Sequence, residues 1–191
     1  HGRTGYTLSL TNTVPDKIGL FPKFDWPRVH NPAIEFDLDG GIANDIAAEE
    51  QRSLDEIEQA YAEHGRRVAA ILIEPMQGEG GMRIPPLGFL KGLREIADLN
   101  DLLLIFDEIQ VGLGRSGKRF CFEHEAVVPD GIVLGKALSG GLVPLSAFVT
   151  HAALMVRAGE ASGALDIVLS EPDLMARIDE LAARLAPRLT G

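Results

Sequence analysis

Two short apolar stretches, each followed at once by a polar residue, restrict most strongly what this chain can fold into. Residues 102–106 (LLLIF) run up to Asp107, and residues 131–135 (GIVLG) precede Lys136. Apolar runs too short for a helix are typical of strands buried on both faces, as in a parallel sheet covered by helices. Because the chemistry of open parallel sheets collects beyond the carboxyl ends of the strands, we expect Asp107, Gln110 and Lys136 to face one crevice.

The flanking sequence predicts the other elements of an α/β chain. Residues 68–73 and 145–150 predict further strands, the first of which brings Glu74 to the same crevice. Helices are predicted over residues 44–64, capped by Asn44, and from residue 89, where apolar residues recur every three or four positions: Phe89, Leu90, Leu93, Ile96 and Ala97. Strand, helix, parallel strand is the right-handed crossover of a doubly wound sheet, so we expect a mainly parallel sheet with helices on both faces.

The two ends of the chain predict less regular structure. Residues 4–12 alternate small polar and apolar residues, which favours a short strand or an extended segment. Residues 14–43 contain four prolines and are predicted to form a loop-rich excursion. We interpret residues 1–155 as part of one domain. Residues 156–191 are interpreted as an altered junction followed by an amphipathic helix, which a capping box at residues 170–173 begins.

The composition argues against several classes of function. With 46% hydrophobic and 24% charged residues among 191, the chain has the makeup of a globular domain. Its net charge of −10 opposes binding to nucleic acid and to anionic membranes, and no apolar run approaches the ~20 residues that span a bilayer. The single cysteine, Cys121, fits the reducing cytoplasm, and no His/Cys cluster has metal-ligand spacing. We therefore expect a cytoplasmic protein that acts on small molecules without a metal.

Three motifs in a fixed order are more specific than composition or spacing. Residues 74–81 (EPMQGEGG), 106–117 (FDEIQVGLGRSG) and 135–141 (GKALSGG) together resemble the class III aminotransferases, a resemblance that covers most of residues 1–150. The opening HGRTGYTLSLTNT, with FPKFDWPR at residues 21–28, looks most like the lysine ε-aminotransferase and ornithine aminotransferase branch. This resemblance implies the large domain of a fold type I enzyme, pyridoxal 5'-phosphate as cofactor, and a homodimer.

The resemblance also implies a role for each candidate site residue. Lys136 would hold the cofactor as a Schiff base and then move a proton between substrate and cofactor. Asp107 would pair with the ring nitrogen, which keeps the ring an electron sink, and Gln110 would contact the phenolic oxygen. Glu79 would be the gate that admits first an ω-amine and then a dicarboxylic keto acid. The implied activity is ping-pong transfer of an amino group from lysine or a similar ω-amino compound to 2-oxoglutarate.

Structural explanations of the same residues stay open at this point. A solvated lysine, an aspartate that caps a turn and a glutamine in a turn hydrogen bond are the alternatives for Lys136, Asp107 and Gln110. The apolar residues around Lys136 argue against a solvated lysine. If Asp107 points into the crevice, Glu108 points away from it, and we expect Glu108 to form a structural salt bridge. If Lys136 is instead buried beside a cationic ring, burial and like charge would lower its pKa.

Two other classes of function compete with the aminotransferase. Residues 103–108 resemble the magnesium-binding strand of P-loop nucleotide hydrolases, but the glycine-rich loop that these proteins need does not precede it. Residues 112–117 fit the dinucleotide fingerprint by letter, but no evident helix follows. The third alternative is a truncated, catalytically incomplete aminotransferase that serves as a structural or interaction module. We expect the chain to be a piece of a longer protein, with a further stretch lost near residues 156–164.

Overall fold

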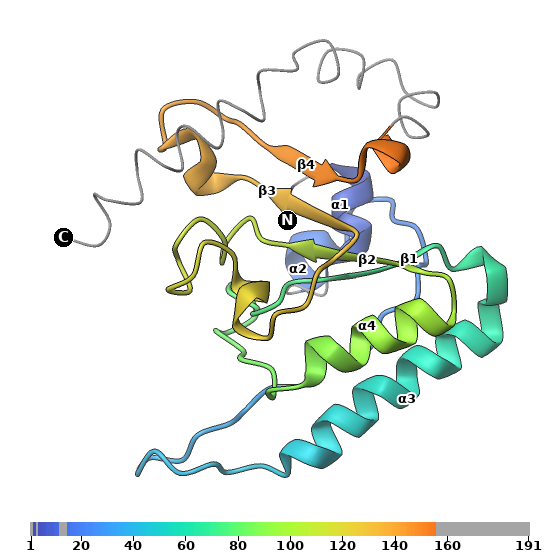
Figure 1. Cartoon of the computed structure of the whole chain (residues 1–191), viewed down its shortest axis with the longest axis vertical. Coiled ribbons are helices and arrows are strands. Elements are labelled where there is room, and N and C mark those ends of the chain that lie inside the picture. Colours follow the sequence, from blue (N-terminus) through green and yellow to red (C-terminus); the bar gives the residue numbers. More distant parts are fainter. Residues whose placement is uncertain (1, 3, 12–14, 156–191) are drawn as a thin grey trace.

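The computed structural model describes residues 2, 4–11 and 15–155 (Figure 1). One sheet contains four strands in the order β1-β2-β3-β4: β1 (Ala70–Ile73), β2 (Leu103–Asp107), β3 (Gly131–Leu134) and β4 (Ala147–Thr150). The first three strands run parallel, and β4 is antiparallel to β3. The predicted α/β fold with a mainly parallel sheet is thereby confirmed. The predictions for residues 156–191 lie outside the described residues.

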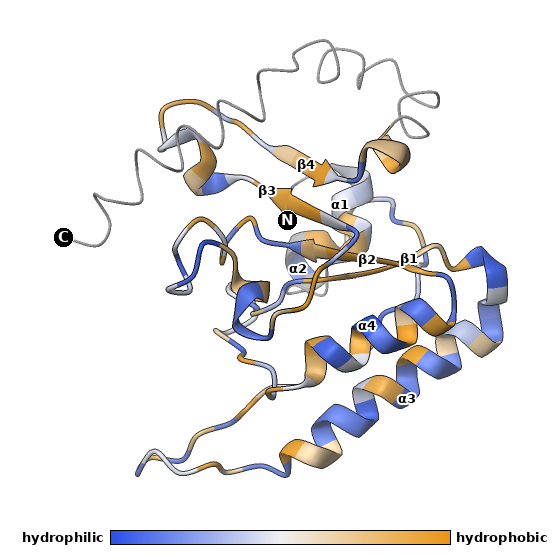
Figure 2. Ribbon diagram, viewed as in Figure 1, coloured by the Kyte–Doolittle hydropathy of each residue, from blue (hydrophilic) through white to orange (hydrophobic). Residues whose placement is uncertain are grey.

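Helix α4 (Phe89–Leu99) covers one face of the sheet. All five of its predicted apolar residues are buried, which confirms that helix. Beneath it lie alternate residues of neighbouring strands, because side chains of a strand point to opposite faces in turn. Phe106 stands between Ile73 and Ile132 in the strand register and is fully buried, as is Leu104. Figure 2 shows these strands in the hydrophobic colours.

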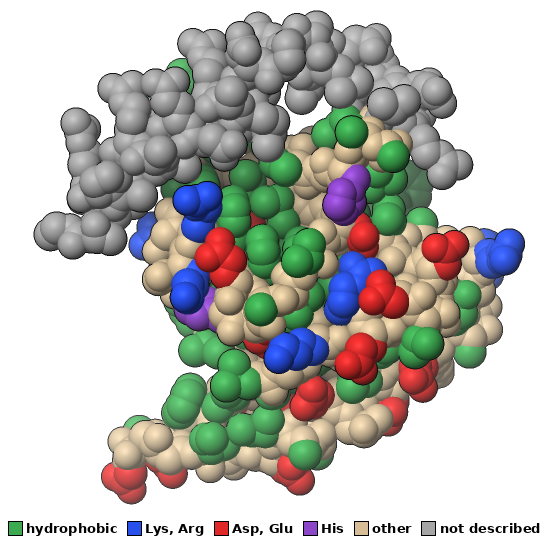
Figure 3. Space-filling model, viewed as in Figure 1, with side chains coloured by type: hydrophobic (Ala, Val, Ile, Leu, Met, Phe, Trp, Pro, Cys, Tyr) green, Lys and Arg blue, Asp and Glu red, His purple; other side chains and the backbone are tan. Residues whose placement is uncertain are grey.

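Helix α3 (Ile46–His64) lies beside α4 (Figure 1) and is mostly hydrophilic. Acidic side chains gather over this part of the molecule in Figure 3, as expected for a solvated face. Asp45, not Asn44, caps the helix, since its Oδ1 accepts the N–H of Ala48 at 3.2 Å. The predicted cap is wrong by one residue because the Asn44 amide bonds backbone groups of the preceding loop. The helix ends at His64, the predicted last residue, and Gly65 is its C-cap.

The first segment is helical, so the prediction of a strand or extended segment over residues 4–12 is wrong. Helix α1 (Gly5–Leu10) is capped by Thr4, whose Oγ1 accepts the N–H of Thr7 at 3.4 Å. Within the helix, Ser9 Oγ donates to the carbonyl of Gly5 at 2.8 Å. The cap at Thr4 thus supports a short helix where alternation favoured a strand.

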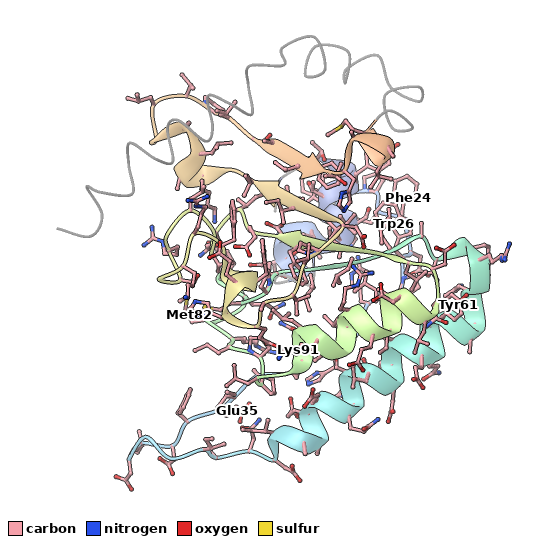
Figure 4. The ribbon with its side chains drawn as sticks, viewed as in Figure 1. Phe24, Trp26, Glu35, Tyr61, Met82 and Lys91 are labelled. Atoms are coloured by element: carbon pink, nitrogen blue, oxygen red, sulfur yellow. The ribbon has the colours of Figure 1, made fainter. Side chains whose placement is uncertain are left out.

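The loop-rich stretch after α1 includes one short helix and an exposed stack of rings. Helix α2 (Pro15–Ile18) forms a single turn. Farther on, Phe24 stacks on Tyr6 of α1 and on Trp26, with ring centroids 5.3 and 5.0 Å apart, and Tyr6 and Trp26 also stack on each other at 6.4 Å. Figure 4 shows Phe24 and Trp26 next to each other. The backbone N–H of Phe24 also donates to Ser9 Oγ at 2.9 Å, so the loop is fastened to α1 at this point.

Asp130, directly before β3, joins the sheet to α4. Its Oδ2 accepts the N–H of Leu104 at 2.8 Å and a guanidinium N–H of Arg94 at 2.7 Å. Burial alone would raise the pKa of Asp130, but these two hydrogen bonds and the charge of Arg94 outweigh burial and lower it. Arg94 also pairs with Asp98 at 2.7 Å, on the exposed surface of α4.

We expect the substitution Asp130→Asn to destabilise the fold at neutral pH and to weaken the pH dependence of stability. A carboxyl group with a lowered pKa in the folded state stabilises the fold fully above its unfolded pKa of about 3.9, and this contribution disappears as pH falls through the folded pKa. Urea unfolding from pH 7 to pH 3 should show wild-type and variant stabilities converging in acid. Asp98→Asn is the control and should change stability less. Stability curves that remain parallel in acid would contradict the expectation.

Candidate active site

The carboxyl ends of the parallel strands bring four polar residues together. Asp107 is the last residue of β2, and Lys136 begins a short 3-10 helix, η3 (Lys136–Ser139), just after β3. Lys136 Nζ donates to Gln110 Oε1 at 2.6 Å. Glu74, directly after β1, lies close enough to Asp107 and Lys136 for both charges to act on it. Residues from three adjacent strand ends therefore share one edge of the sheet.

The two acids at this edge are shielded from water to different degrees. Asp107 is 5% exposed, and its Oδ1 accepts the N–H of Ile109 at 3.0 Å. Asp107 thus caps a turn, as its structural explanation predicts. The same hydrogen bond fixes the orientation of the Asp107 carboxylate. Burial, aided by the charge of Asp107, raises the pKa of Glu74, against a hydrogen bond from Gly78 and the charge of Lys136. This edge therefore favours a ligand that carries positive charge beside Asp107.

Lys136 is exposed, so the expectation of a buried amine is not met in the described part of the chain. Its side chain borders an open hollow of about 510 Å³, which Ser139 and residues 141–146 also line. The backbone of Lys136 is left-handed, with φ of 44°. Such a conformation costs a side-chain-bearing residue roughly 1–2 kcal/mol, and strain of this kind clusters at functional sites.

The glycine-rich turn after β1 packs directly on Gln110. Backbone hydrogen bonds of 3.0 and 2.9 Å between Gln77 and Arg83 close this turn. A Cβ added to Gly78 would lie 2.3 Å from the Gln110 side-chain amide, so only glycine permits this approach without displacing that amide. Glu79 is exposed in the same turn, and no hydrogen bond or ion pair joins it to another described residue.

Sequence reasoning missed the partners of Glu108. The predicted salt bridge is wrong: the Glu108 side chain is buried, and its two oxygens accept the N–H groups of Cys121 and Phe122 at 2.9 and 3.0 Å. Burial raises the pKa of Glu108, and the two N–H groups only partly oppose this rise. Alternation along the strand indicates the side on which the Glu108 side chain lies. It does not indicate that this side chain accepts backbone N–H groups 13 and 14 residues farther along the chain.

Cys121 is a buried free cysteine. Burial first, and then the negative charge of Glu108, raise the pKa of the Cys121 thiol to about 11. Since the thiolate is the nucleophilic form, this thiol is inert at neutral pH. We therefore assign Cys121 to packing and not to chemistry.

The described residues give no support to the competing classes of function. Residues 111–120 form turns and bends, followed only by the short 3-10 helix η2 (Cys121–His124), so the dinucleotide fingerprint lacks its helix. Within the described ranges, no group of three or more His, Cys, Asp or Glu residues is arranged to hold a metal. In the same part of the chain, no helix has the length and apolar character needed to cross a membrane.

Comparison with known proteins decides the family. The model of the family Aminotransferase class-III matches residues 1–165. This chain belongs to the class III aminotransferases. Ornithine aminotransferase 1 of Staphylococcus aureus is 43% identical over 151 residues, which cover 79% of this chain and 33% of the relative. The L-lysine-epsilon aminotransferase of Mycobacterium bovis is 43% identical over 136 residues, or 71% of this chain and 30% of the relative.

The solved structures agree with this assignment. The lysine aminotransferase of M. tuberculosis superposes with a TM-score of 0.65 at 41% identity, over 72% of this chain and 31% of that one. The fold of this class III aminotransferase chain therefore corresponds to part of the fold type I domain, as predicted. The chain spans about a third of the length of these curated relatives: 33% of the ornithine aminotransferase and 30% of the lysine-epsilon aminotransferase.

The site residues fit the cofactor of this family, pyridoxal phosphate. A buried carboxylate, Asp107, suits a protonated ring nitrogen. The amide of Gln110 and the amine of Lys136 lie 2.6 Å apart, beside the hollow that Lys136 borders. An amine, an amide and a buried carboxylate are the groups that such a cofactor needs around its aldehyde, its phenolic oxygen and its ring nitrogen. We call this part of the site its reacting half.

Proposed function

We propose that this chain carries the reacting half of the site of an aminotransferase that moves an amino group from lysine or a similar ω-amino compound to 2-oxoglutarate. The observation that supports this most directly is the Lys136 amine, 2.6 Å from Gln110 Oε1 and on the same sheet edge as buried Asp107. Likeness to ornithine and lysine-epsilon aminotransferases supports an ω-amine as the donor.

In this proposal Lys136, Asp107 and Gln110 each have a separate role. When bound, pyridoxal phosphate supplies an aldehyde that condenses with amines and a ring that withdraws electrons from the substrate carbon. Lys136 Nζ would hold the cofactor covalently and, once released, would take the proton from the substrate carbon and deliver it to the cofactor. Asp107 keeps the ring nitrogen protonated, since a charge pair is strong where water is excluded. Gln110 donates an amide N–H to the phenolic oxygen.

Three further parts of the proposal rest on the family. Glu79, exposed in the turn that packs on Gln110, is proposed as the substrate gate, which pairs with an arginine outside this chain. A homodimer follows from the resemblance to the family. A cytoplasmic location is proposed from the single cysteine, which fits a reducing compartment.

Covalent trapping tests the proposed function. The chain is mixed with pyridoxal phosphate, reduced with borohydride, and mapped by peptide mass spectrometry. The expected result is one reduced adduct, on Lys136. Lys91 on α4 (Figure 4) and Lys118 in the turn are internal controls, because they are exposed, as Lys136 is, whereas Lys136 is the one that donates to Gln110. Labelling spread evenly over them, or no labelling of Lys136, would refute the role of this residue.

A catalytically incomplete aminotransferase fragment is the second candidate function. The observation that favours it is the share of the relatives that the chain covers, 33% and 30%. Proximity and orientation supply much of enzyme catalysis, so a partial site turns over slowly even when its amine is well placed. Adduct formation at Lys136 without transamination of lysine or ornithine would favour this candidate.

A further inference from the structure

Glu108 lies between Asp107 and Gln110 in the chain, and its main chain and side chain both form hydrogen bonds with backbone groups. Its main chain and both carboxylate oxygens form hydrogen bonds of 2.9 to 3.0 Å with four residues: Val133, Gly112, Cys121 and Phe122. Its side chain is 1% exposed. None of these four bonds uses a charged partner, although burying a carboxylate without one is costly. The carboxylate must therefore do something at this position that an apolar side chain cannot.

The Glu108 carboxylate closes the loop of residues 109–120. It reaches from the end of β2 to the first residues of η2, so both ends of residues 109–120 are fixed on Glu108. The loop also winds tightly at its start, because a Cβ added to Gly112 would lie 2.7 Å from the Glu108 carbonyl oxygen. Gln110, the hydrogen-bond partner of Lys136, stands in this tight first turn.

We propose that Glu108 is a positioning residue, whose buried carboxylate holds the loop of residues 109–120 so that Gln110 faces Lys136. The proposal deepens the proposed function and rests on it for the meaning of the Gln110–Lys136 contact. Glu108 acts through the loop, since alternation of the chain directs it to the side opposite Asp107. Two acceptor oxygens are required because two backbone N–H groups, of Cys121 and Phe122, converge on them.

The substitution Glu108→Gln removes one of the two acceptors while it keeps the shape of the side chain. An amide offers one oxygen, and its NH2 group then faces a backbone N–H, which leaves a buried donor unpaired. Glu125→Gln is the matched control. Glu125 is also buried, at 8% exposure, but its Oε2 accepts the N–H of Gly88 at 2.9 Å, at the start of α4, and not the N–H groups of Cys121 and Phe122 that Glu108 accepts.

The primary measurement needs no cofactor: the NMR signals of the Gln110 side-chain amide in the whole chain. We expect Glu108→Gln to shift these signals and to speed amide hydrogen exchange at Cys121 and Phe122 about tenfold, the equivalent of one lost hydrogen bond. The secondary measurement is the equilibrium affinity for pyridoxal phosphate and the absorption maximum of the bound form. Affinity should fall about tenfold in Glu108→Gln. In Glu125→Gln, affinity and Gln110 signals should match wild type.

Unchanged Gln110 signals in Glu108→Gln, or equal shifts in both variants, would show that Glu108 is merely structural and overturn the proposal. If Glu108→Gln does not fold, Glu108→Asp is measured instead. It keeps the charge but is one methylene shorter, and the same shift of Gln110 is expected. Wild type that forms no adduct at Lys136 would refute the proposed function alone, because the Gln110 signals still decide what Glu108 does.

Discussion

Replacement of Lys136 by alanine is expected to abolish the borohydride-stable adduct with pyridoxal phosphate. For the proposed transamination, the same substitution should slow turnover by roughly 100- to 10,000-fold, the range of acid–base catalysis. The reason is positional: the Lys136 amine is the one that lies 2.6 Å from Gln110 at the carboxyl edge of the sheet. Because Lys136 is exposed, its removal should leave the fold intact, which circular dichroism checks.

Two further variants test the positive charge and the backbone conformation of Lys136 separately from its amine. Lys136→Arg keeps a positive charge near Gln110 but cannot condense with an aldehyde, so it should behave as Lys136→Ala in trapping. Lys136→Gly should be about 1 kcal/mol more stable than Lys136→Ala, because glycine adopts the observed φ of 44° without a Cβ clash. An adduct that persisted in Lys136→Ala would show that another amine is the reactive one.

Leu93→Ala is expected to destabilise the fold strongly, with a loss of about 2–5 kcal/mol in the free energy of unfolding. Leu93 is 0% exposed and belongs to the core that α4 forms with the sheet. The loss combines the lost burial of a side chain with the cavity left behind, and it is a large part of the ~5–15 kcal/mol that stabilises a typical domain. Urea unfolding at constant protein concentration measures it.

The same helix supplies the control for this prediction. Leu99, the last residue of α4, is 84% exposed, so Leu99→Ala should change stability by no more than about 0.5 kcal/mol. Both substitutions remove the same atoms from the same helix and differ only in burial. Similar losses in the two variants would mean that α4 does not pack on the sheet as described.

Local patterns predicted the parts of the site that depend on strand ends. The apolar runs before Asp107 and Lys136 placed these residues at one sheet edge, where the structure has them. The spacing of three and four around Leu93 predicted the buried face of α4. These predictions succeeded because the length and flanking residues of a short apolar run indicate a buried strand, and spacings of three and four indicate an amphipathic helix.

The predictions that failed depend on hydrogen bonds that periodicity does not encode. Thr4 stabilises the start of α1 by accepting the N–H of Thr7, a helix cap that an alternating pattern typical of a strand does not encode. Glu108 meets backbone donors from a segment 13 and 14 residues away, which no local pattern specifies. The surroundings of Lys136 likewise depend on how residues 141–146 fold back around it.

The stack of rings on α1 determines what an optical experiment on this chain will report. Trp26 is the single tryptophan, and it stacks on Phe24 in a loop, not on the sheet. Its fluorescence therefore follows the release of that loop from Tyr6, whereas far-ultraviolet circular dichroism follows α3, α4 and the strands. A tryptophan melting curve alone will measure the detachment of a surface segment, and only its coincidence with the dichroism curve will justify a two-state stability.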